Sequence, residues 1–106
     1  MPKYLIQASY TAEGLKGLQK DKASGRRTAV ASAAETLGGK LEATYYTFGE
    51  EDVIVILDLP DNVAASALSL AVSASGLVRT KTTPLLTVED VDKALAKSVS
   101  YRAPGR

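Results

Sequence analysis

Residues 53–59 read VIVILDL, and this stretch constrains the fold of the chain more than any other. Its odd-numbered positions are all apolar, as expected for a strand whose side chains point alternately to the two faces of a sheet. Ile54 and Ile56, on the opposite side, are apolar as well. In an antiparallel sheet with one wet face these positions would be polar. The sheet around this strand therefore needs a cover on both faces.

A second copy of the chain is the simplest cover for the second face, through packing of sheet on sheet. Exposed apolar patches on soluble proteins usually mark interfaces. The alternative is a cover formed within the chain, by its last helix. We expect the first arrangement, and with it a homodimer or a higher homo-oligomer.

Four strands are predicted from alternating, β-branched and aromatic patterns, at residues 3–10, 40–48, 53–59 and 77–86. In the second of them we expect Leu41, Ala43 and Tyr45 to share one face. The acidic turn between the second and third strands makes these two a hairpin.

The first helical pattern follows Thr11, a predicted N-cap. Gly14 and Gly17 each cost a helix about 1 kcal/mol relative to alanine, so we expect this helix to be short or irregular. Ser24 is a second N-cap candidate where the pattern restarts. Residues 30–37 then carry an apolar stripe for packing on a sheet, and two glycines end the helix.

Two more helices are predicted. One runs from Asp61, its N-cap, to about Ala74, and the other follows Thr87, whose spacing to Asp90 is typical of a capping box. The apolar side of the former is expected to consist of Val63, Ala67, Leu70 and Ala74.

The resulting order, β-α-β-β-α-β with a terminal helix, predicts an α+β fold of the ferredoxin-like sandwich type. We expect one domain over residues 1–97 and a flexible tail over residues 98–106, paired with a second copy as a dimeric α+β barrel.

The chain resembles the GYD-domain family over about residues 2 to 92. The resemblance rests on three blocks: MPKYLIQASYTAEGLKGL, ETLGGKLEATYYTFGEEDVIVILDLPDN and VRTKTTPLLT. The middle block is the most specific, because a glycine turn, a hairpin and a proline stop occur together. The resemblance implies a ferredoxin-like, dimeric α+β-barrel type of fold in a bacterial family of uncharacterised function, and it implies no reaction.

The motif after which that family is named falls in the acidic turn. Gly49 and Asp52 match it, while Glu51 stands where the family typically has tyrosine. Asp52 is expected on the same side as Ile54, and a carboxylate at the rim of an apolar cavity has a raised pKa and can act as a general base. Asp52 is therefore our candidate catalytic residue. The alternative is a solvated hairpin turn with a positive φ at the glycine.

Four further side chains are candidates for ligand binding: Tyr4, Tyr45, Tyr46 and Arg26. A phenol can orient a polar ligand in an apolar pocket, and an arginine near a helix start favours an anion. The alternatives are core packing for the tyrosines and a solvated helix face for the basic group. No metal site is predicted, because two neighbouring carboxylates without a preorganised loop bind a cation weakly.

Composition excludes several chemistries. The chain has no cysteine, histidine or tryptophan, which removes thiolate nucleophiles, Ser-His-Asp triads and imidazole-bound metals. A formal charge of +1 disfavours a nucleic-acid surface. No glycine-lysine phosphate loop, signal segment or bilayer-length apolar run is present, so we expect a cytoplasmic protein without a cofactor and without nucleic-acid or membrane partners.

The leading hypothesis is a small homo-oligomer that binds a small organic molecule in a pocket at the sheet. A second is a cofactor-free enzyme of the monooxygenase, isomerase or lyase type, with Asp52 as base, which rests on fold analogy. A third is a structural or regulatory assembly subunit without a ligand. A cavity with room for a molecule would favour the first two over the third.

Overall fold

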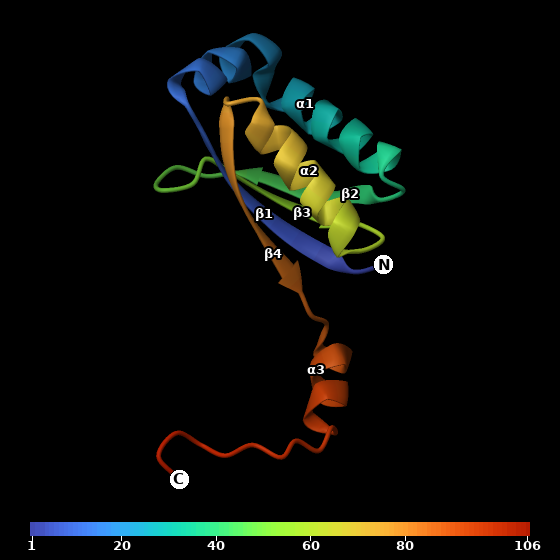
Figure 1. Cartoon of the computed structure of the whole chain (residues 1–106). Coiled ribbons are helices and arrows are strands. Elements are labelled where there is room, and N and C mark those ends of the chain that lie inside the picture. Colours follow the sequence, from blue (N-terminus) through green and yellow to red (C-terminus); the bar gives the residue numbers. More distant parts are fainter.

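The computed structural model describes residues 1–106 and shows an α+β fold with an open four-stranded antiparallel sheet. Two long helices pack on one face of the sheet, and a third, short helix lies beyond its edge (Figure 1). The strands lie in the order β2-β3-β1-β4, and their bounds are β1 Lys3–Tyr10, β2 Lys40–Tyr46, β3 Val53–Asp58 and β4 Val78–Leu85. The helices are α1 Ala12–Thr36, α2 Asn62–Ala74 and α3 Val88–Leu95.

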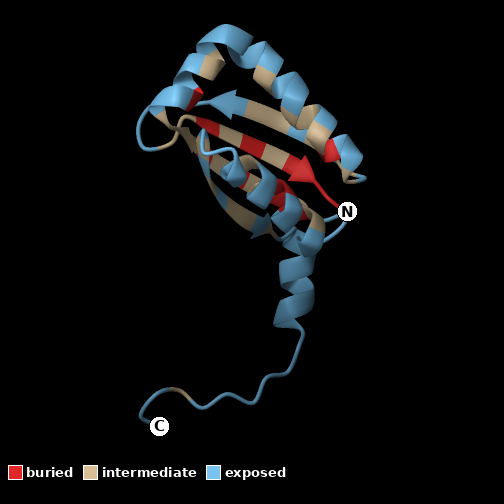
Figure 2. Cartoon of the chain, turned by 45° about the horizontal axis from the view of Figure 1, so that its top comes forward, coloured by how far each residue is buried: buried red, intermediate tan, exposed pale blue.

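The core lies between the sheet and the helices α1 and α2. Alternate residues of the central strands β1 and β3 are buried there, and Figure 2 shows them as red bands along the strands. Ile6 of β1 pairs with Val55 of β3 in register, and both lie under the helices. The buried apolar residues are Tyr4, Ile6, Ala8, Ala34, Val53, Val55, Leu57, Leu59, Ala65 and Leu68. The element order and the strand order agree with the ferredoxin-like arrangement expected from the sequence.

Helix α1 is irregular, as expected, but it is long, and its break lies at Lys22 and not at Gly14 or Gly17. Thr11 is its N-cap and accepts a hydrogen bond from the Gly14 amide at 3.1 Å. A Cβ on Gly14 would collide with the carbonyl of Leu77, so glycine permits the close approach of α1 to the start of β4. The helix breaks at Lys22, which has φ 67° and ψ 164°. The break therefore precedes Ser24, and the Ser24 side chain is not the N-cap of the second segment.

Strand β2 differs from the sequence prediction. A β-bulge shifts its register between Leu41 and Ala43, so that Leu41 pairs with Leu57 while Ala43 pairs with Ile56. Side chains on either side of a bulge exchange faces. Leu41 consequently faces the helices and Tyr45 faces away from them, and the expectation that they share one face was wrong.

The orientation of α2 also differs from the prediction. Its N-cap Asp61 is confirmed, but the helix buries Ala65 and Leu68, while Val63 and Leu70 are exposed. The apolar residues of α2 are distributed all around the helix, so periodicity alone did not identify the side that packs on the sheet. The outer side of α2 therefore presents an apolar stripe to solvent.

The capping box predicted at Thr87 is present at the start of α3. Thr87 Oγ1 accepts a hydrogen bond from the Asp90 amide at 3.0 Å, and the Thr87 amide donates to the Asp90 carboxylate at 3.3 Å. No residue of α3 is buried, and the helix lies beyond the end of β4 rather than over the sheet (Figure 1). The alternative in which the last helix covers the second face is therefore wrong for the single chain.

The sheet face opposite the helices, which we call the open face, has no cover within the chain. Leu5 pairs there with Ile56 in register, Ile54 lies two residues from Ile56 along β3, and all three are only partly buried. Residues 98–106 form no helix or strand. None of the helices combines the length and the apolar character that a membrane crossing needs.

Candidate functional site

A cavity of about 110 Å³ lies between α1, α2 and the covered face of the sheet. Twelve of its seventeen lining residues are hydrophobic, which makes it an apolar site with a few polar groups. Its polar groups include the side chains of Tyr10, Arg26, Thr44 and Tyr46. A cavity of roughly 150 Å³ lined by apolar side chains binds benzene. This cavity is therefore of a size for one ring or a chain of a few carbons.

Tyr46, at the end of β2, supplies a phenol to this cavity. Partial burial of Tyr46, which is 37% exposed, together with the neighbouring Tyr10 phenol raises its pKa to about 12, although Arg26 acts in the opposite direction. The hydroxyl of Tyr46 therefore keeps its proton at neutral pH and can donate a hydrogen bond. It is poorly suited to proton transfer, since efficient acid–base groups have pKa values near the working pH.

Thr44 lies two residues earlier on β2 and faces the same cavity. Its hydroxyl oxygen is buried and has no hydrogen-bond partner. An unpaired buried polar group costs about 1–3 kcal/mol, so its presence needs an explanation. A polar atom of a bound molecule would provide the missing partner.

Arg26 brings a positive charge to the cavity from the second segment of α1. Its side chain is 33% exposed, so it reaches both the cavity and solvent. Its only ion pair, with Asp21, is long, at 3.6 Å. The guanidinium group therefore retains hydrogen-bonding capacity for an anionic group that enters from solvent.

The structure brings together two of the five predicted site residues, Arg26 and Tyr46. Tyr4 lies elsewhere, at the other end of the core, where it is buried and its hydroxyl donates to Asn62 Oδ1 at 2.7 Å. It lines a separate and more polar hollow of about 560 Å³. Tyr45 projects from the open face and is 64% exposed.

Asp52 anchors the turn after β2 to the end of β1. Its carboxylate accepts a hydrogen bond from the Tyr10 amide at 2.8 Å, and its own amide donates to the Ala8 carbonyl at 2.9 Å. The Ser9 hydroxyl donates to the Glu50 carbonyl and to the Glu51 carboxylate, at 2.9 and 3.2 Å. Asp52 does not line the apolar cavity. These contacts assign the acids a part in holding the turn, and Gly49 has the expected positive φ, 137°.

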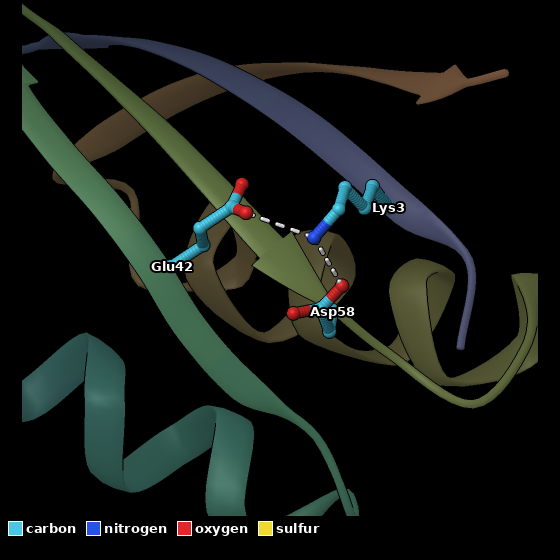
Figure 3. A network of polar contacts seen from close by, with 3 residues as sticks. All are labelled: Lys3, Glu42 and Asp58. Atoms are coloured by element: carbon cyan, nitrogen blue, oxygen red, sulfur yellow. Dashed lines mark hydrogen bonds and ion pairs between the residues drawn. The ribbon is translucent and has the colours of Figure 1, made fainter. Parts of the chain in front are cut away.

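A second polar cluster lies at one end of the open face. The Lys3 ammonium contacts Glu42 Oε1 at 2.9 Å and Asp58 Oδ1 at 2.8 Å, and so links the three strands β1, β2 and β3 (Figure 3). The hydrogen bond to Asp58 raises the pKa of Lys3 most, and the hydrogen bond to Glu42 raises it further. The bulge in β2 places Glu42 where it meets Lys3. No group of three or more side chains suited to metal binding occurs in the chain.

The polar residues of the cavity that were not among the predicted site residues are Tyr10, Arg27, Thr44, Ser69 and Thr80. Tyr10 has the parity of Tyr4 along β1, so the alternation of that strand would have placed it on the covered face. Thr44 could not be placed from parity, because the bulge after Leu41 reverses the faces of β2.

The model of the GYD domain family matches residues 4–95. This chain belongs to the GYD domain family. The matched range takes in all four strands except Lys3, the first residue of β1, and ends at Leu95, the last residue of α3. Neither the comparison with curated proteins nor that with solved structures finds a match.

Proposed function

We propose that this GYD-domain protein binds a small organic anion, one aromatic ring or a short chain with a carboxylate, in the cavity between its helices and sheet. The observation that carries the proposal is the combination of an apolar cavity of about 110 Å³ with an unpartnered Thr44 hydroxyl, a protonated Tyr46 phenol and the Arg26 guanidinium at its wall. The apolar wall takes up the ring or chain, and the two hydroxyls and the guanidinium bind the carboxylate.

Binding without turnover fits this set of groups better than catalysis does. A phenol with a pKa of about 12 is a donor and not a base near neutral pH. The carboxylate of Asp52, the candidate base, is hydrogen-bonded to the backbone of β1. The presence of room for a ring also weighs against a purely structural subunit with a filled core.

The test uses benzoate as the probe. Its binding is measured by NMR titration, from the chemical shifts of the alanine and valine methyl groups. Saturable shifts confined to cavity methyls such as those of Val30 and Val72 are expected, with a Kd on the order of 1 mM, as suits so small a ligand. Benzyl alcohol, which lacks the charge, should bind more weakly. Absence of saturable shifts with benzoate would contradict the proposal.

Two variants assign the binding to its parts. Ala33→Leu fills the cavity and should abolish the shifts, while Arg26→Gln should raise the Kd about tenfold by removing a charge-assisted hydrogen bond. Arg102→Gln, in the exposed tail, is the matched control and should leave the Kd unchanged. An Arg26→Gln variant with the Kd of the wild type would refute the anion contact.

We further propose that the open face packs against the open face of a second copy, as in a dimeric α+β barrel. Leu5, Ile54 and Ile56 support this proposal, because they form a contiguous apolar row that nothing in the chain covers. Ile54→Asp would place a charge in the centre of this interface. Light scattering should then show a dimer for the wild-type protein and a monomer for the variant, and a monomeric wild type would refute the proposal.

A further inference from the structure

The chain after β4 forms an arm, residues 86–106, that lies apart from the body of the molecule. Only Leu86 and Thr87 separate β4 from α3, and α3 continues away from the sheet (Figure 1). The family match includes this helix to its last residue. The helix of the arm is therefore part of the domain, yet it has no partner surface within the chain.

Helix α3 needs such a surface. Val88, Val91 and Leu95 lie on one side of it, at spacings of three and four residues, and are 75%, 41% and 78% exposed. The helix has eight residues, and isolated helices shorter than about 12–15 residues are marginal in water. Its capping box stabilises the start, but most helical stability in proteins comes from packing of the apolar side.

The charges of the arm match those of the open face. Asp92 of α3 borders the apolar side, Glu89 lies one turn before it and further round the helix, and the helix carries three acids against one lysine. Arg79 and Lys81 of β4 stand on the open face, opposite Ser9 and Gln7 of β1 in register. The four ion pairs of the chain use none of these charged residues.

An apolar residue lies beside the two basic side chains. Leu5 faces the same side of the sheet and pairs with Thr83, two residues along β4 from Lys81. The β1–β4 side of the open face thus offers an apolar side chain, Leu5, next to two positive charges. The arm offers an apolar stripe next to two negative charges.

We infer that α3 of one copy packs on the β1–β4 side of the open face of a second copy, and that the two copies exchange arms. Val91 and its neighbours in the stripe lie against Leu5, and Glu89 and Asp92 face Arg79 and Lys81. This inference rests on the proposed pairing through the open face, and it identifies the element of the partner that closes one side of the interface. In a two-fold symmetric dimer this contact occurs twice, once between each α3 and the sheet of the other copy.

Charge reversal with rescue tests the pairing in the full-length chain. The double variant Arg79→Glu, Lys81→Glu should raise the dimer dissociation constant about tenfold, as should Glu89→Lys, Asp92→Lys. Combining all four substitutions should restore the wild-type value to within about threefold. All four positions are exposed, so the fold should persist, which circular dichroism checks. A combined variant as weak as either double variant would overturn the inference.

Cross-linking tests the exchange itself, because the chain has no cysteine of its own. Chains with Asp92→Cys are mixed with chains with Lys81→Cys under mild oxidation. A disulfide-linked dimer should form faster in the mixture than in either variant alone. Mixing Asp92→Cys chains with chains carrying Ala67→Cys, on the exposed side of α2, is the matched control. Equal or faster cross-linking to α2 would overturn the inference.

The outcomes separate this inference from the proposed pairing. If Ile54→Asp dissociates the dimer while charge reversal and cross-linking show no arm contact, the arm exchange is wrong and the pairing of open faces stands. A monomeric wild-type protein overturns both. Val91→Asp, Leu95→Asp supplies a further check, because it should weaken the dimer more than tenfold while leaving the buried core intact.

Discussion

The two faces of the sheet differ in what covers them, although β3 carries apolar side chains toward both. On one face Leu57 and Leu59 are fully buried beneath α1 and α2. On the other, Ile54 and Ile56 come from the same part of the chain and remain partly exposed. The covered face holds the core and the cavity, and the open face holds surface that a single chain leaves without a partner. Packing within the chain therefore supplies a layer of helices on only one of the two faces (Figure 1).

The largest expected effect on the free energy of unfolding is that of Leu57→Ala, and Ile56→Ala is the variant to compare with it. Leu57→Ala removes a fully buried side chain and should lower the free energy of unfolding by about 2–5 kcal/mol. Ile56→Ala should cost less at low protein concentration, and its cost should grow with concentration, because only the paired state buries Ile56 fully. Urea denaturation at several protein concentrations measures both. A cost of Ile56→Ala that does not vary with concentration would contradict the proposed role of the open face.

Asp52→Ala should have the next largest effect. The substitution removes the carboxylate that accepts the Tyr10 amide, and loss of a hydrogen bond to a charged group costs about 1.5–3 kcal/mol. Glu50→Gln is the matched control, since the contact of Glu50 uses its backbone carbonyl, and it should leave stability unchanged. Equal stabilities of the Asp52→Ala variant and the wild-type protein by chemical denaturation would refute the anchoring role.

The sequence predicted the elements of the fold well where local chemistry decides. The caps at Thr11, Asp61 and Thr87 are present as expected, because each depends on one side chain and the amide three residues later. The assignment of strand residues to the two faces succeeded for β3, where alternation is uninterrupted.

Predictions failed where the environment decides. The bulge after Leu41 has no signal in the sequence, because Leu41, Ala43 and Tyr45 alternate with polar residues as in a regular strand. The bulge reverses the face of Thr44. The inward side of α2 was misassigned because its outward side, with Val63 and Leu70, is equally apolar. Among the candidate site residues, Tyr46 and Arg26 meet only through the tertiary packing of α1 on β2.

A smaller effect is expected from Thr44→Val, which tests the role of the unpaired hydroxyl in the cavity. Valine has nearly the shape of threonine and removes the unpaired buried hydroxyl. The ligand-free protein should gain up to about 1 kcal/mol of stability, because no buried polar group is left without a partner. The same variant should bind benzoate more weakly. A destabilised ligand-free variant in thermal denaturation would show that the hydroxyl has a partner in solution.

The smallest effect at neutral pH concerns Tyr46. Because its pKa in the folded chain is raised from 10.0 to about 12, its contribution to stability is fully present below pH 10 and is lost as the pH rises toward 12. Tyr46→Phe should remove this part of the alkaline pH dependence, while Tyr101→Phe, in the exposed tail, should not. The measurement is the denaturation midpoint of each protein across this pH range. An equal pH dependence of the midpoint for Tyr46→Phe and for the wild-type protein would contradict the role of Tyr46.

The most direct test of the unequal faces is native mass spectrometry of the full-length protein, with and without benzoate. We predict a dimer, with one benzoate bound per chain, and dissociation to monomers on introduction of Ile54→Asp without loss of bound benzoate. That pattern would show that the open face pairs copies while the covered face binds the ligand. A wild-type protein that remains monomeric even at high protein concentration would contradict the pairing of open faces.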